Sequence, residues 1–171
     1  MTIVDLPDRD DIRTTETREQ IDADAFADAR ESEPVQSGWV VVALTFDPAG
    51  SVLLIEEPWA DGWLAPGGAR QPGESLETAV TREIDEETGV EATPIAPRAV
   101  DEFTFEHERT GETVGWTLVC FEAIADDPTI DRDPSVDDEE ITDIRWFEGL
   151  PENVFNPDLM VSAYEECVKG P

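Results

Sequence analysis

The sequence predicts an α/β protein in which a mixed β-sheet is flanked by helices on both faces. Two short, valine- and leucine-rich runs at residues 39–46 and 51–57 are typical of adjacent strands. Residues 75–88 have the apolar spacing of a helix, and residues 156–168 form a second helical segment after further strands. Because one helix interrupts the strands and another follows them, we expect the sheet to be covered from both sides.

Residues 1–36 form an acidic extension whose composition differs from that of the rest of the chain. Its Asp, Glu, Arg and Ala content, with sparse apolar positions, predicts a weakly amphipathic helix over residues 8–33, capped by Asp8 or Asp10. A proline and a Ser-Gly pair mark the boundary with a folded domain at residues 37–171. The extension is interpreted either as a solvated acidic segment or as a dimerisation or docking element, which would make the protein a homodimer.

The first part of the domain predicts a hairpin followed by a loop. WVVVALTF at 39–46 is too short for a buried helix, and the turn residues DPAG separate it from SVLLIEE at 51–57. WLAPGG at 63–68 is interpreted as a short extended segment that ends in a Pro-Gly-Gly loop.

One strong helix is predicted at residues 75–88. Leu76, Val80 and Ile84 recur at four-residue steps and therefore share one face. Gly89 is a natural C-terminal stop, because glycine adopts the left-handed conformation that ends many helices.

The remainder of the chain predicts three strands and a closing helix. RAVDEFTFEHE and TVGWTLVCFEAIA flank the turn RTGE, and ITDIRWF follows an acidic loop at 126–140. The closing helix is expected to begin with Asn156 as cap and Pro157 at its first position.

The chain is strongly acidic. Its 171 residues include 42 Asp and Glu against 11 Lys and Arg, a formal net charge of −31. Such a field repels phosphate, so the charge excludes binding to nucleic acid or to an anionic membrane by bulk electrostatics. Disorder is the alternative for so charged a chain, but the long apolar runs require burial. We therefore expect a folded protein from a halophilic host, where salt screens the self-repulsion.

Cysteine use and the absence of targeting patterns predict a soluble cytoplasmic protein. Cys120 and Cys167 lie far apart, and with His107 alone they cannot complete a zinc site. The N-terminus lacks the basic and apolar regions of a signal peptide, and no stretch approaches the ~20 apolar residues of a membrane span.

Residues 82–89, REIDEETG, contain four acids in eight positions. Glu83, Glu86 and Glu87 are spaced i, i+3 and i+4, so they share one helix face. Three carboxylates that close raise each other's pKa values, and a hard divalent cation removes that cost. The face is interpreted as a metal site, although an arbitrary acidic helix would be a solvated surface.

The motif is longer than this run. From residue 68 to residue 90 the chain follows Gly-x5-Glu-x7-Arg-Glu-Ile-x-Glu-Glu-x-Gly-Val, which resembles the Nudix box with every defined position filled. WLAPGG and ITDIRWF also resemble family segments, so the likeness covers roughly residues 38–150. It implies a Nudix-type α/β/α sandwich and an enzyme that hydrolyses a diphosphate linkage in a nucleoside diphosphate derivative. Mg²⁺ or Mn²⁺ would be the cofactor.

The resemblance also implies roles for individual residues. The expected metal ligands are Glu83, Glu86, Glu87 and a carbonyl at Gly67. The general base is expected either in the box or in a later loop, with candidates Glu86, Glu87, Glu139 and Glu140. Structural roles within the motif are expected for Gly68, Glu74, Arg82 and Gly89. Arg82 is expected to brace the loop by reaching Glu74, the alternative being a surface ion pair with Glu86.

Substrate contacts are less constrained. Arg70 enters the box and is interpreted as a phosphate ligand or as a surface arginine. Trp63, Phe105 and Trp116 are candidates for stacking on a base, the alternative being burial in the core.

The sequence leaves the substrate open. Phe105 and Glu106 stand where many ADP-ribose hydrolases have a proline, and the patterns associated with diadenosine polyphosphates and NADH are absent. The cysteines are badly placed for an isopentenyl diphosphate isomerase. The remaining alternative to a hydrolase is a non-catalytic nucleotide-binding or regulatory module of the same fold.

Overall fold

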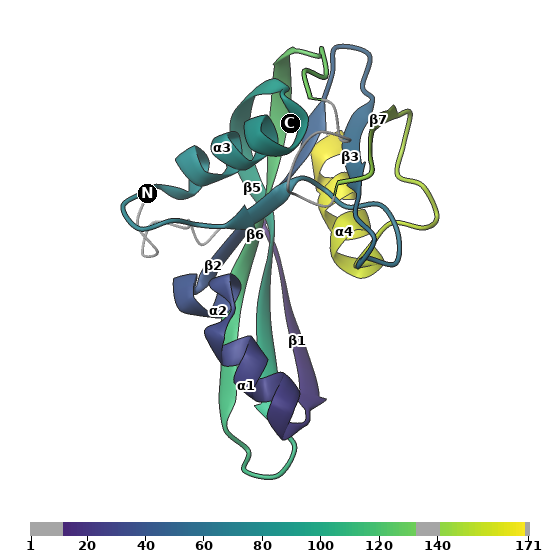
Figure 1. Ribbon diagram of the computed structural model, residues 1–171. Helices are drawn as coiled ribbons and strands as arrows, with labels where there is room; N and C mark the ends of the chain where they lie inside the picture. The colour runs from purple at the N-terminus through teal and green to yellow at the C-terminus, as the bar shows by residue number, and fades with distance from the viewer. Residues whose placement is uncertain (1–11, 133–140, 170–171) are drawn as a thin grey trace.

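The structure, a computed structural model, describes residues 12–132 and 141–169. A mixed sheet has the strand order β1-β5-β6-β2-β3-β7, and β4 pairs with β2 beside β3 (Figure 1). The strands are β1 Arg13–Ile21, β2 Trp39–Phe46, β3 Val52–Glu56, β4 Gly67–Ala69, β5 Glu91–His107, β6 Thr113–Asp127 and β7 Asp143–Phe147. The helices are α1 Ala23–Glu31, α2 Glu33–Ser37, α3 Leu76–Thr88 and α4 Pro157–Val168.

The sheet has a hydrophobic core on each face, as predicted. Val41 and Ala43 of β2 join the cluster under α3, whereas Leu44 and Phe46 join the cluster under α4. This division follows from the alternation of side chains along a strand. Figure 1 shows the two helices on opposite sides of the sheet, which is the α/β/α arrangement.

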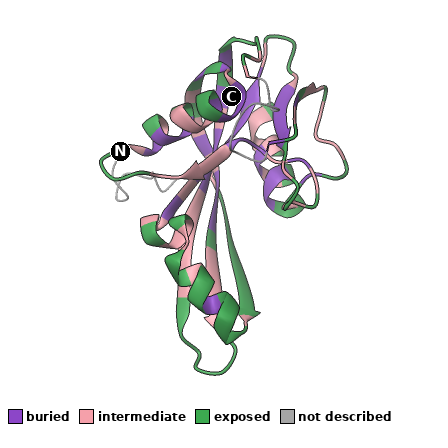
Figure 2. Ribbon diagram, viewed as in Figure 1, coloured by how far each residue is buried: buried purple, intermediate pink, exposed green. Residues whose placement is uncertain are grey.

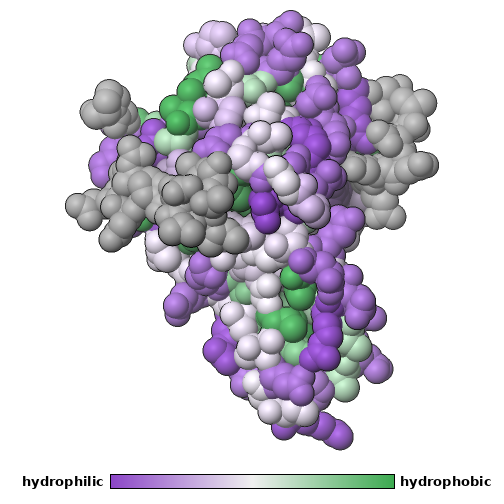
Figure 3. All heavy atoms as spheres, turned by 90° about the vertical axis from the view of Figure 1, so that its left-hand side faces the viewer, coloured by the Kyte–Doolittle hydropathy of each residue, from purple (hydrophilic) through white to green (hydrophobic). Residues whose placement is uncertain are grey.

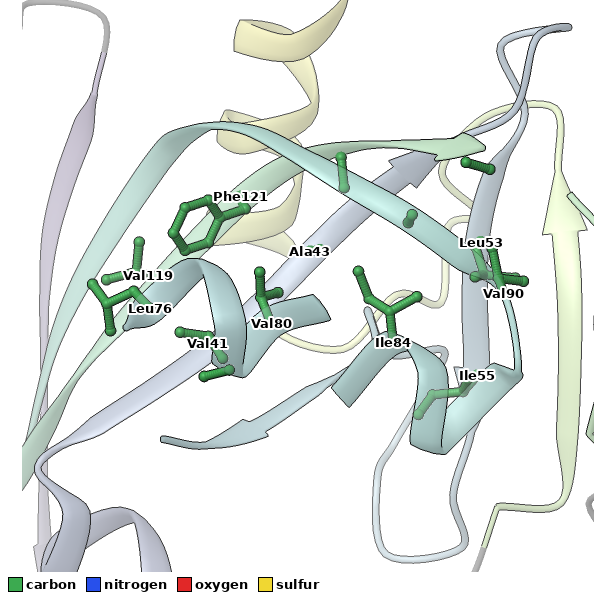
Figure 4. Close-up of a cluster of buried hydrophobic side chains, with 14 of the residues drawn as sticks. Val41, Ala43, Leu53, Ile55, Leu76, Val80, Ile84, Val90, Val119 and Phe121 are labelled. Carbon is green, nitrogen blue, oxygen red and sulfur yellow. The ribbon is translucent and has the colours of Figure 1, made fainter. Parts of the chain in front are cut away.

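Helix α3 confirms its predicted limits. Leu76, Val80 and Ile84 are fully buried and point at the sheet (Figure 4). Burial of each such side chain contributes about 1.5–3 kcal/mol. The Ser75 hydroxyl accepts a hydrogen bond from the Thr78 N–H, and Gly89 ends the helix with φ 72°. A Cβ on Gly89 would lie 2.3 Å from the Asp131 carbonyl oxygen. Both this close approach and the positive φ therefore require glycine at the position.

The predicted hairpins and closing helix are also confirmed, with two local differences. β2 and β3 are antiparallel, as are β5 and β6. The predicted Pro-Gly-Gly loop instead runs into β4, which pairs with β2. Asn156 occupies the N-cap position of α4, but it adopts φ 53° and its side chain makes no capping hydrogen bond.

The prediction of one helix through the N-terminal extension is wrong for residues 13–21. These residues form β1, which pairs in parallel with β5, and helix α1 begins only after Asp22, whose carboxylate caps the Ala25 N–H at 2.8 Å. The proposed caps Asp8 and Asp10 lie outside the described residues. The β-branched threonines of β1 favour a strand, and the hydroxyls of Thr15 and Thr17 donate to Asp101 of β5. The division of the chain at residue 37 stays a prediction.

Together with α1, the long β5–β6 hairpin and β1 form an arm that extends below the main body in Figure 1. Most of the arm is exposed or half-buried (Figure 2). Phe26 of α1 is buried and meets the ring of His107 edge-on at 5.2 Å, which fixes the helix to the end of β5.

The surface reflects the composition. Hydrophilic residues dominate the face shown in Figure 3. None of the helices in the described ranges combines the length and apolar character needed to cross a bilayer. Both cysteines are free thiols, and burial raises the pKa of Cys120 to about 12, so this thiol stays protonated.

Candidate active site

Arg82 connects three carboxylates of the box. Its guanidinium donates two hydrogen bonds to Glu74, at 2.7 and 2.9 Å, one to Glu83 at 2.8 Å and one to Glu86 at 3.1 Å. A further bond reaches the Ala69 carbonyl at 3.2 Å. The hydrogen bonds from Arg82 hold the pKa of Glu74 below its usual range, against the opposing effect of burial. The predicted bracing of the loop by Arg82 is therefore present, and it includes Glu83, which the sequence did not suggest.

Gly68 lets β4 approach α3. A Cβ at this position would lie 2.6 Å from Oε1 of Glu83, inside van der Waals contact. Any side chain on residue 68 would therefore displace the Glu83 carboxylate.

Glu87 is the buried acid of the box. It is 4% exposed, and its Oε1 accepts a hydrogen bond from the Gly67 N–H at 2.7 Å. The same side chain lines a cavity, together with Gly67 and Gly68. Glu87 therefore joins the end of α3, strand β4 and the cavity at one point.

The three expected metal ligands lie on one helix, but among the described residues no three His, Cys, Asp or Glu side chains are arranged so that they could hold a metal ion. Glu83 and Glu86 contact Arg82, whereas Glu87 contacts Gly67. The donor chemistry fits Mg²⁺ or Mn²⁺, because carboxylate and backbone oxygens are the ligands that hard divalent cations prefer.

The cavity next to Glu87 has a volume of about 710 Å³, within the range typical of small-molecule sites. The part of its wall that β5 and β6 supply, the aromatic end, contains Phe103, Phe105 and Trp116. Among the described residues that line it, no basic side chain occurs, and the charged ones are Glu19, Glu57, Glu87 and Asp101. A polyanion can therefore enter this cavity only together with positive charge from elsewhere.

Two predicted substrate contacts do not lie in the cavity wall. Trp63 is 9% exposed and packs edge-on against Phe147 at 4.8 Å, in the core under α4. Base stacking by Trp63 is thus not supported, because its surface is already buried. Arg70 donates to the Glu74 carbonyl at 3.0 Å and helps to hold the loop. Glu139 and Glu140 fall outside the described residues.

The structure adds cavity residues that the sequence analysis did not select. Trp59 is 63% exposed and meets Phe155 edge-on at 5.5 Å, and both line the cavity. Asp101 and Thr17 also line it, from β5 and β1. The sequence could have indicated Trp59, because a tryptophan in the polar loop Glu-Pro-Trp-Ala-Asp-Gly is a candidate for ligand contact. Asp101 and Thr17 could not be found in this way, because they come together only through the pairing of β1 with β5.

The model of the NUDIX domain family matches residues 37–158, most of the chain. The protein belongs to the Nudix family. A curated relative from Bacillus subtilis, the uncharacterized Nudix hydrolase YvcI, is 34% identical over 95 residues, which cover 56% of each chain. The match thus spans little more than half the length of that relative.

Three solved structures illustrate the similarity in fold. A UDP-X diphosphatase superposes with a TM-score of 0.57 at 20% identity, over 87% of this chain and 72% of the other. The Bacillus subtilis pyrophosphohydrolase BsRppH gives 0.54 at 18% identity, over 81% and 84%. An ADP-ribose pyrophosphatase from Streptococcus suis gives 0.52 at 16% identity, over 75% and 90%.

Proposed function

We propose that this Nudix protein is a metal-dependent hydrolase that cleaves a diphosphate linkage in a nucleoside diphosphate derivative. The cavity carries this proposal: it joins the buried acid of an intact Nudix box to an aromatic wall, and its charged side chains are all acidic. At the Glu87 end, the phosphates of a substrate would need a cation to offset the acidic charge. At the aromatic end, a planar base can stack on the rings. The similar solved structures named as a diphosphatase, a pyrophosphatase and a pyrophosphohydrolase support the same class of reaction.

Glu83, Glu86 and Glu87, with the backbone at Gly67, are the residues that would hold Mg²⁺ or Mn²⁺. A bound cation of this kind supplies charge neutralisation of the diphosphate and lowers the pKa of a coordinated water. Arg82 holds the Glu83 and Glu86 carboxylates by hydrogen bonds, and Gly68 leaves room for the Glu83 carboxylate. The candidates for the general base remain Glu86, Glu87, Glu139 and Glu140.

Product analysis by mass spectrometry tests the reaction. The protein would be incubated in molar KCl, with Mg²⁺, with Mn²⁺ or with EDTA, against nucleoside triphosphates, ADP-ribose, NADH, sugar nucleotides and dinucleoside polyphosphates. We expect a nucleoside monophosphate to be released from one group of substrates only when metal is present. Nucleotide binding without products, from folded protein, would instead identify a non-catalytic nucleotide-binding module.

The charge of the chain supports a further part of the proposal, that the protein works in the cytoplasm of a halophilic host. The net charge of −31 loosens the fold by self-repulsion in dilute buffer. Because the Debye length falls from about 10 Å at 0.1 M salt to about 3 Å at 1 M, salt should relieve this repulsion. We expect the melting temperature to rise by about 5–10 °C between 0.1 and 2 M KCl, equivalent to about 2–3 kcal/mol. A melting temperature that is independent of KCl, measured by circular dichroism, would contradict the halophilic origin.

A further inference from the structure

Asp101 of β5 is a buried carboxylate at the aromatic end of the cavity. It is 2% exposed, yet it forms part of the cavity wall. Its Oδ1 accepts hydrogen bonds from the Thr15 hydroxyl at 2.6 Å and from the Thr17 hydroxyl at 3.1 Å. Within residues 12–132 and 141–169 these two hydroxyls are the donors that reach its side chain, and Oδ2 receives none of them. A buried carboxylate oxygen that can still accept a hydrogen bond is suited to bind a donor group of a ligand.

The aromatic wall lies beside this carboxylate. Phe103 and Phe105 follow Asp101 at two-residue steps on β5, so the three side chains share one face of the strand. Phe103 stacks on Trp116 of β6, with centroids 4.6 Å apart and planes inclined by 14°. Phe105 meets Trp116 edge-on at 5.7 Å. The rings hold each other in place and offer apolar surface on which a planar heterocycle can stack.

We propose that this end of the cavity binds the nucleobase of the substrate, and that Asp101 selects bases carrying an exocyclic amino group. The inference rests on the proposed function, since it names the substrate class of the same cavity. A carboxylate only accepts hydrogen bonds, so an amino group is matched to Oδ2, whereas a carbonyl oxygen in its place meets a second acceptor. Cytosine and uracil differ in this way at carbon 4.

The N-terminal strand builds the subsite. Thr15 and Thr17 both belong to β1, and their hydroxyls orient Asp101 by binding its Oδ1. Glu19, two residues further along β1, lines the same end of the cavity and adds a second group that only accepts. The N-terminal segment is thereby assigned a role in substrate choice.

Two measurements on matched nucleotides test the proposal. The first is kcat/KM for CTP and UTP with the preferred metal, and the second is calorimetric binding of the α,β-methylene diphosphates of cytidine and uridine, which cannot be cleaved between the α and β phosphates. We expect wild-type protein to prefer cytosine by about tenfold or more in both measurements. Asp101→Asn keeps the shape and an acceptor for the threonines but places an NH₂ group where Oδ2 was, so the preference should fall or invert towards uracil.

Glu102→Gln is the matched control. Glu102 is the next residue of β5, lies on the opposite face, and contacts Thr117 instead of the cavity. The Glu102→Gln substitution removes the same charge as Asp101→Asn, and it should leave the cytosine-to-uracil ratio unchanged. Trp116→Leu should weaken binding of both analogues about tenfold at a constant ratio, because stacking does not depend on the amino group.

The outcomes separate the two proposals. Equal binding of both analogues by wild-type protein, or a ratio that Asp101→Asn leaves as it is, would overturn the base-selection proposal even if hydrolysis were observed. Cytosine-selective binding that depends on Asp101, without hydrolysis of any substrate, would support base selection and contradict the hydrolase. If Asp101→Asn does not fold, the wild-type preference and the Trp116→Leu result decide the question.

Discussion

Replacing Glu87 by glutamine is expected to lower kcat for the preferred substrate by about a thousandfold, within the range measured for loss of a catalytic proton-transfer group or metal ligand. Glu87 is buried at the cavity wall, and its neutral isostere weakens both the attraction for a divalent cation and the capacity to accept a proton. The measurement is steady-state kinetics over a range of Mg²⁺ and Mn²⁺ concentrations.

The glutamine variant should remain folded. The amide oxygen of glutamine can still accept the hydrogen bond that the Gly67 N–H donates at 2.7 Å. Asp85→Asn serves as control, because Asp85 lies in the same acidic run but is exposed. Wild-type activity in the Glu87→Gln enzyme, or an equal loss in Asp85→Asn, would contradict the assignment of the metal site.

Replacing Arg82 by glutamine is expected to lower the free energy of unfolding by about 3 kcal/mol. The half-buried guanidinium makes hydrogen bonds to three carboxylates and one carbonyl, and hydrogen bonds to charged groups contribute about 1.5–3 kcal/mol each before compensation. Arg18→Gln is the control, because the Arg18–Glu106 pair involves an exposed arginine, and exposed pairs contribute about 0–1 kcal/mol. Urea unfolding in 2 M KCl gives both values, and equal small losses in the two variants would contradict the bracing role of Arg82.

The effect of the Arg82 substitution should depend on pH. Hydrogen bonding from Arg82 lowers the pKa of Glu74 in the folded protein, so the stabilisation is complete above the unfolded value of about 4.3. It is lost as the pH falls through the lower folded pKa, because a protonated Glu74 no longer attracts the guanidinium. The stability difference between wild type and Arg82→Gln should therefore be constant near neutral pH and shrink below about pH 4.

The elements that local physics determines were predictable from the sequence. Helix α3 follows from apolar residues at four-residue steps between Ser75 and Gly89, and both of these residues cap it as their chemistry requires. β2 follows from an apolar run that needs burial on two faces, which the two cores supply. The box glutamates share a helix face because of spacing alone. Arg82 lies in the same helix, and it reaches Glu74 because Glu74 directly precedes the N-cap Ser75.

What depends on distant partners was not predictable. β1 consists of charged and threonine side chains with almost no apolar residues, so its sequence does not predict a strand. It forms a strand because it pairs with the edge of β5, where its threonines bind the Asp101 carboxylate. The burial of Trp63 was not predictable either, because it depends on packing against Phe147, which is distant in the sequence. The cavity wall made by Asp101 and Thr17 joins two segments that are more than eighty residues apart.

The parallel pairing of β1 with β5 also has a consequence for synthesis of the chain on the ribosome. β1 cannot pair until β5 has been synthesised, and Asp101, the partner of Thr15, lies 86 residues later in the chain. At about 5–20 residues per second, this takes roughly 4–17 s, during which a nascent strand can associate with neighbouring chains. β1 contains five charged or amide side chains among its nine residues, and eight of the nine remain exposed in the finished protein. This composition makes the unpaired strand soluble while it waits, and it later protects the same strand as the outer edge of the sheet against self-association.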